Sequence, residues 1–302
     1  MAAEPPEPTA LGNGSSLIIG NVGWVYTPER KRGFLGTAVV WAERNELDTL
    51  NLIVDDHSAS LAAVAAGFQD SPVIWEAQGT ELHAAEPVPA AMPVAPETDE
   101  FVSVLVEAGL EVVADHGVWI GELNGLEVAR IGLIHGTPTI DLGVGAYDQF
   151  ASAAIDPDRD PAEALRMIIG LVAPHRRAGS EPHPMGRLVR SRWLRAQAVR
   201  NPSLLGLDSL HPVPLLEARP GLQEDQPAAA LGAVRDDEVL VVFAVGLDLG
   251  VSETAAGLIG LHEPTRVIVA MPSRDHHDRI RSSLDRLSVP VDLIALEGEW
   301  AG

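Results

Sequence analysis

The alternation of apolar and polar positions along the chain predicts a mixed α/β (α+β) protein. The chain opens with apolar runs of strand length separated by turn residues, which predict a β-rich N-terminal unit at 16–85 with one helix. We expect strands at 16–26, 36–43, 48–55 and 73–78 and a helix at 58–68. Residues 1–15 are rich in Glu, Pro and Gly and are expected to be disordered.

A second unit is expected at 98–200, after a linker. Residues 86–97 contain four prolines with alanines between them, a composition typical of an extended linker. Thr98 and the apolar spacing after it predict a helix, and short apolar runs between turn residues predict a meander up to residue 144. Further helices are expected at 147–155, at 161–172 and, rich in arginine, at 188–199.

The C-terminal part shows the clearest alternation. Residues 201–237 are punctuated by prolines and are expected to form an irregular arm. Within 238–302, strands at 239–245, 266–270 and 291–296 alternate with helices at 252–259 and 275–287. A β-α-β-α-β order predicts a parallel sheet with crossover helices.

Composition narrows the classes of function. The 302 residues include no cysteine, which excludes disulfides, thiolate metal sites and cysteine nucleophiles. No apolar run reaches the roughly 18 to 20 residues that cross a bilayer, and the N-terminus lacks the basic and apolar regions of a signal peptide. We therefore expect a cytoplasmic protein of a bacterium with no membrane association.

The formal net charge of −22 disfavours nucleic acid as a partner of the whole molecule. The only lysine, Lys31, lies in a turn-like Arg-Lys-Arg-Gly context. Schiff-base and P-loop chemistry both require a suitably placed lysine and are not expected here.

Positive charge gathers in one segment, 174–200, which contains nine basic residues and one acid, Glu181. The guanidinium groups of this segment could hold phosphates, and an aromatic ring among them could stack on a base. The candidate ligand-binding residues are Arg187, Arg190, Arg192, Trp193 and Arg195. Alternatively, these arginines dock on an acidic face of the same chain.

Acidic residues at strand ends suggest two further sites. Asp55 and Glu76 could form a divalent-cation site. The alternative is that the acids at this strand end serve the following helix, with Asp56 or Ser58 as its cap. The sequence predicts no cofactor, and a divalent cation is the one that these acids could hold. Asp248 and Ser252 follow a buried strand, where α/β sheets bind small ligands or nucleotides in a crevice, but a plain β-α turn capped by Ser252 has the same pattern.

The order helix, strands, helix at 99–155, with Glu127 and Asp141 on strands, resembles the core of the PD-(D/E)xK nuclease superfamily over about a fifth of the chain. The resemblance implies that these two acids are weak candidates for the superfamily's magnesium-binding, water-positioning pair. Gly143 stands where the superfamily has a lysine. The departure implies a degenerate, non-cleaving copy.

Residues 186–195, 245–249 and 269–275, and Gly143-Val144-Gly145 with Asp148 downstream, resemble a conserved uncharacterised family of actinobacteria. The resemblance implies common descent and a complete fold, but it identifies no catalytic residue in this chain. Its usual Gly-Arg-His-Asp is replaced here by Gly145-Ala146-Tyr147-Asp148.

The leading hypothesis is a non-catalytic cytoplasmic protein that binds a protein partner or a phosphorylated ligand, because no complete catalytic set is present in the sequence. A nuclease-related or DNA-processing accessory protein is the first alternative, and a small-ligand protein with its site near Asp248 is the second. The sequence predicts no oligomeric state.

Overall fold

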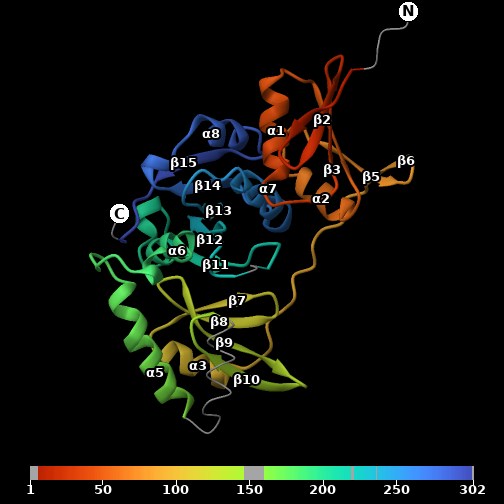
Figure 1. The fold of residues 1–302 in the computed structure, drawn as a ribbon. Coiled ribbons are helices and arrows are strands. Elements are labelled where there is room, and N and C mark those ends of the chain that lie inside the picture. Colours follow the sequence, from red (N-terminus) through yellow and green to blue (C-terminus); the bar gives the residue numbers. More distant parts are fainter. Residues whose placement is uncertain (1–5, 146–159, 219–220, 236, 301–302) are drawn as a thin grey trace, which may run out of the picture. The chain divides into compact units, whose positions relative to one another are not determined.

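A computed structural model describes residues 6–145, 160–218, 221–235 and 237–300 (Figure 1). It confirms the mixed α/β class, with seven α-helices and three sheets among these residues. The chain forms two compact units. Unit 1 comprises Met1–Ala90, Leu247–Ile268 and Asp275–Leu293, and unit 2 comprises Ala91–Gly246, Val269–Arg274 and Ile294–Gly302.

The first sheet has the strand order β1-β2-β3-β4-β5-β6. Its strands are β1 (Thr9–Leu11), β2 (Gly14–Ile19), β3 (Val22–Thr27), β4 (Thr49–Val54), β5 (Val73–Gln78) and β6 (Glu81–Ala84). The β3-β4 and β4-β5 pairs are parallel, and the other pairs are antiparallel. Parallel neighbours need crossover connections, which helices α1 (Phe34–Arg44) and α2 (Ser58–Ala65) provide.

Three expectations for this sheet are wrong. Residues 9–15 are not disordered, because β1 pairs with β2. The expected strand at 16–26 is divided between β2 and β3 by a turn with Gly20 at φ 61°.

The expected strand at 36–43 is helix α1, so the N-terminal unit has two helices instead of one. Val39 and Val40 favour strands because they are β-branched. However, Leu35, Val39 and Ala42 are buried and recur at helical spacing, so tertiary packing decides the structure of this segment.

Unit 1 also contains α7 (Gly250–His262) and α8 (Asp278–Leu284), which the sequence analysis assigned to a separate C-terminal unit. Both α1 and α2 pack against α7. Two glycines leave room for close contact: a Cβ on Gly36 of α1 would lie 2.3 Å from the Leu249 carbonyl oxygen just before α7, and one on Gly67 just after α2 would lie 2.2 Å from that of Ala256.

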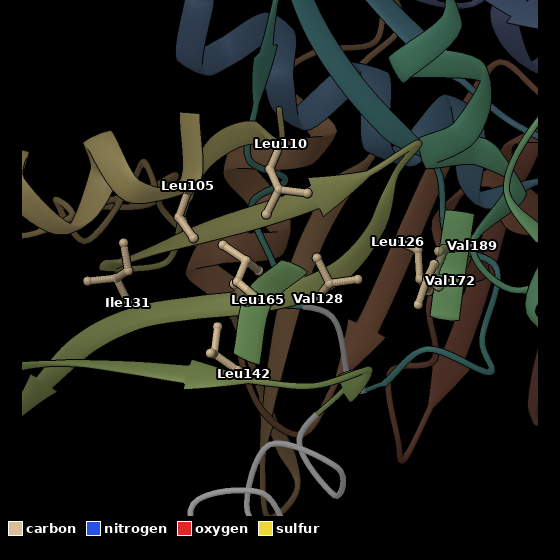
Figure 2. Packing of buried hydrophobic residues seen from close by; sticks show 10 residues of the cluster. Leu105, Leu110, Leu126, Val128, Ile131, Leu142, Leu165, Val172 and Val189 are labelled. Carbon is tan, nitrogen blue, oxygen red and sulfur yellow. The ribbon is translucent and has the colours of Figure 1, made fainter. Parts of the chain in front are cut away.

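Unit 2 contains an antiparallel sheet with the order β10-β9-β8-β7. Its strands are β7 (Glu111–Asp115), β8 (Val118–Leu123), β9 (Leu126–Ile134) and β10 (Thr137–Leu142). Helices α3 (Asp99–Glu107) and α5 (Pro161–Val172) pack against it, as the predicted helix and meander required. Figure 2 shows Leu105 of α3 and Leu165 of α5 packed in the cluster with Val128 of β9. The helix expected at 147–155 lies outside the described residues.

The third sheet has the order β11-β12-β13-β14-β15. Its strands are β11 (Ser209–Val213), β12 (Ala228–Val234), β13 (Asp237–Phe243), β14 (Arg266–Met271) and β15 (Val291–Ala295). The predicted alternation of strands and helices from residue 238 onward is confirmed. The irregular arm expected at 201–237 is wrong in part, because β11 and β12 lie within it and pair antiparallel. Helix α6 (Arg190–Arg200) packs against β11, β12 and β13.

Candidate functional site

Three glutamates stand side by side across the sheet of unit 2. The strand register places Glu111 of β7 opposite Glu122 of β8, and Glu122 opposite Glu127 of β9. Like charges at opposed positions destabilise a sheet unless other charges compensate. A buried row of this kind therefore needs cations close to it.

Arginines compensate every member of this glutamate row. Glu122, whose side chain is fully buried, accepts from Arg192 Nη1 and Arg195 Nη2, each at 2.5 Å. These two arginines share a face of α6 because they are three residues apart. At either end of the row, Arg200 lies 3.2 Å from Glu111, and Arg130 donates to both carboxylate oxygens of Glu127.

Burial and charge shift pKa values around the row. The pKa of Glu111 is raised by burial and, secondarily, by the repulsion of Glu122, against the attraction of Arg195 and Arg200. At Asp115, burial is the largest single influence and raises the pKa. Arg192 and His116 together outweigh it, so that pKa lies below its usual value. Burial thus disfavours the charged form of Glu111 although Arg200 is close to it.

Arg176 is a fully buried cation beneath this region. Its guanidinium lies 4.2 Å from the centroid of the Trp193 ring and donates to the carbonyl oxygens of Asn124, Met185 and Leu188. Burial lowers its pKa to about 9. Because its donors reach both the 185–188 segment and Asn124, Arg176 holds the arginine-rich segment against the β8-β9 turn.

The expected phosphate-binding and base-stacking group does not exist as a free surface. Trp193 is fully buried and cannot stack on a base, and Arg192 and Arg195 are held by Glu122. Arg190 lies 3.7 Å from Asp225, and Arg187 is the exposed member of the group. The alternative, in which the arginines dock on an acidic face of the same chain, describes the structure.

A pocket of about 490 Å³ opens at the Glu111 end of the row. Its charged and amide side chains belong to Glu111, Glu122, Asn124, Arg177, Arg200 and Glu299. Arg200 donates to Glu111, to Asn124 (2.5 Å) and to Glu299 (3.4 Å). Arg177 is exposed and makes no ion pair with any residue that the structure describes.

The nuclease-like acids do not form a joint site with this pocket. Glu127 is buried and held by Arg130, and Asp141 lies opposite Arg130 in the β9-β10 register. The pocket wall includes neither acid. The Arg130 guanidinium therefore binds the Glu127 carboxylate, which the resemblance assigned to magnesium binding.

The expected cation pair Asp55 and Glu76 is wrong as a joint site. Tyr26 donates to Asp55 from the sheet face that it shares with Ile53. Glu76 shares the other face with Val54 and accepts from Ser58 of α2. Among the described residues, no three His, Cys, Asp or Glu side chains are arranged to hold a metal ion.

These hydrogen bonds shift the pKa values of Tyr26 and Glu76. The hydrogen bond to Asp55 raises the pKa of Tyr26, and the hydrogen bond from Ser58 lowers the pKa of Glu76. Glu76 thus connects β5 with the start of α2. The expected cap by Asp56 or Ser58 is wrong, because the N-cap residue of α2 is His57 and the helix begins without a side-chain cap.

The expected crevice at Asp248 and Ser252 is filled within unit 1. Asp248 pairs with Arg32 at 2.7 Å and accepts from the Gly250 amide. Ser252 is fully buried, and a Cβ on Gly36 of α1 would lie 2.9 Å from its hydroxyl. These contacts leave the two side chains engaged within the chain and give no support to a small-ligand site here. The expected cap by Ser252 is wrong, because its hydroxyl donates to the Leu249 carbonyl oxygen and α7 begins without a side-chain cap.

Sequence reasoning missed Glu111, Glu122, Arg177, Arg200 and Glu299 as a group. Glu111 and Glu122 were detectable from the sequence, because acids inside apolar strands are unusual unless they are paired. Comparison of the chain with protein-family models, with curated proteins and with solved structures finds no match. No helix in the described ranges has the length and apolar character needed to cross a membrane.

Proposed function

We propose that this protein is a non-catalytic cytoplasmic protein that binds a small molecule carrying an anionic group, and that the pocket beside Arg177 and Arg200 is its binding site. The observation that carries this proposal is the charge arrangement of the pocket. Arg177 faces it without a carboxylate of its own among the described residues, while the floor at Glu122 is neutralised by two buried arginines.

The rigidity of the floor supports binding. Glu122 and Arg195 are buried and joined directly, and Arg176, the residue before Arg177, is anchored to the carbonyl oxygens of Met185 and Leu188. A ligand entering such a site orders few side chains, so little of its interaction energy is lost to conformational entropy. The volume, about 490 Å³, is within the range of small-molecule sites.

The state of the acids supports a role without catalysis. A general base or magnesium ligand must offer a free carboxylate oxygen to its substrate or ion. Both oxygens of Glu127 accept from Arg130, and both oxygens of Glu122 accept from arginines of α6. The Glu122 carboxylate therefore serves the packing of α6, and the Glu127 carboxylate is held within its own strand.

Calorimetric titration of the full chain with two probes, succinate and inorganic phosphate, tests the proposal. We expect Arg177→Gln to weaken binding about tenfold, because one charge-assisted hydrogen bond contributes about 1.5 kcal/mol. Arg187→Gln is the matched control, since it removes the same charge from an exposed position of the same segment outside the pocket wall.

The control should change the dissociation constant by less than about twofold. Equal losses in the two variants would show that only long-range charge attracts the probes. No binding of either probe to any variant would overturn the proposed function.

A further inference from the structure

We propose, on the basis of the proposed function, that Glu299 is an internal competitor for this pocket and that the ligand class is small carboxylates. The Glu299 side chain lines the pocket and meets Arg200 there. In this arrangement the chain supplies its own carboxylate where the carboxylate of a ligand would bind.

The contacts of Arg200 separate a fixed side from a replaceable one. Nη1 donates to Glu111 and Asn124, which belong to β7 and to the β8-β9 turn. Nη2 meets Glu299 at 3.4 Å, with the two side chains 43% and 37% exposed. Exposed pairs of this length are weak, so a better placed carboxylate can replace Glu299 at little cost.

Glu299 is held near Arg200 by anchors on both sides. Glu297 accepts from the Ser273 amide and hydroxyl, and its carbonyl oxygen accepts from Gln197 of α6. Trp300 packs against Trp193 with ring centroids 5.7 Å apart. The tether gives the Glu299 carboxylate a high effective concentration at Arg200, as in other intramolecular ligands.

Charge in the pocket favours a carboxylate over a phosphate. Glu111 lines the wall of the pocket, is paired with Arg200 and repels a compact dianion more strongly than a group with one negative charge. Arg200 and Arg177 are separate cations on this wall, so each can take one carboxylate of a small dicarboxylate, with the planar fork of guanidinium matching each group.

The test titrates the full chain and its Glu299→Gln variant with succinate and, separately, with inorganic phosphate. We expect the variant to bind succinate about two- to fivefold more tightly, because the competitor is gone. Glu181→Gln is the matched control: it removes one negative charge at an exposed position of unit 2 outside the pocket wall, and affinity should stay within about 1.5-fold. In an Arg200→Gln background, Glu299→Gln should have no effect.

Several results would overturn the inference. One is that Arg177→Gln weakens succinate binding while Glu299→Gln has no more effect than Glu181→Gln. This result would support the proposed binding site but exclude Glu299 as a competitor. A second is a gain in phosphate affinity equal to or larger than the gain for succinate, which would exclude carboxylate selectivity. Absence of binding in all variants would overturn both proposals.

Discussion

Glu122 is the residue on which the charges of unit 2 converge. Its side chain is fully buried, it faces two arginines of α6, and it stands between Glu111 and Glu127 in the strand register. A buried ion pair of this kind adds little net stability compared with apolar packing, but breaking it leaves a charge uncompensated inside the protein.

We therefore expect Glu122→Ala to lower the free energy of unfolding by about 3–5 kcal/mol, because Arg192 and Arg195 lose their shared partner. Urea unfolding followed by circular dichroism measures this. Glu107→Ala, at an exposed position of α3, is the control and should stay within about 0.5 kcal/mol of the parent. Similar losses in both variants would contradict the assigned role of Glu122.

Glu111 makes stability depend on pH. Its pKa in the folded protein is raised above 4.5, so the folded state binds its proton more tightly than the unfolded state does. The resulting stabilisation is complete below pH 4.5 and is lost as the pH rises through the folded pKa. Glu111→Gln keeps the side chain neutral at every pH.

We expect the free energy of unfolding of Glu111→Gln, relative to the parent, to increase between about pH 4 and about pH 7. Urea unfolding at several pH values measures the difference. Glu107→Gln should show no such trend. A difference for Glu111→Gln that is constant over this range would mean that the Glu111 pKa is not raised.

The row of glutamates was partly predictable from the turns. A tight turn joining Asp115 to Val118 fixes the pairing of Glu111 with Glu122, and the turn between Leu123 and Leu126 brings Glu122 beside Glu127. The arginines that meet these acids come from α6, and no local pattern in the sequence gives the face on which a distant helix packs. The role of Glu299 depends on the same kind of long-range contact.

At the scale of elements, the strands and helices that the sequence predicted correctly are mainly those whose residues are apolar and buried. The strands and helices from 238 onward were predictable because β13 and β14 are apolar at nearly every position and the helices have clear limits. Helix α1 was missed because its valines favour strands locally, and β12 because Ala-rich strands have low intrinsic preference and gain stability only from their neighbours.

The packing of α1 on α7 depends on a glycine. We expect Gly36→Ala to destabilise the protein by about 1–3 kcal/mol, although alanine favours helices, because its Cβ would lie 2.3 Å from the Leu249 carbonyl oxygen. Gly170→Ala in α5 is the matched control: nothing lies within 4 Å of its Cβ position, so the change should stabilise by about 0.5–1 kcal/mol. Thermal and urea unfolding of both variants measure the difference. Equal gains would show that the helices do not approach as closely as described.

At the scale of the whole molecule, the same order of elements occurs twice. Three antiparallel strands followed by helix, strand, helix and strand describe both β1 to β5 and β11 to β15. The helices of the first series, α1 and α2, pack against α7 of the second. Unit 1 is therefore built from both ends of the chain, with most of unit 2 between them in sequence.

This organisation predicts that a chain ending at Gly246 leaves α1 without its cover. We expect backbone amides of 34–44 to exchange with solvent freely in that fragment and to be protected in the full chain, as measured by hydrogen exchange with mass spectrometry. Equal protection of these amides in the fragment and the full chain would show that the first series of elements is stable alone.

The Leu35 amide at the start of α1 donates a hydrogen bond to the carboxylate of Glu253, which lies 218 residues later in the chain. A ribosome that adds about 5–20 residues per second needs on the order of 10–40 s to make that intervening stretch. For this interval the newly made helix α1 can pack against β4 of its own sheet, but its partner α7 does not yet exist. Apolar surface that is exposed for this long during biosynthesis is prone to aggregation until α7 has been made.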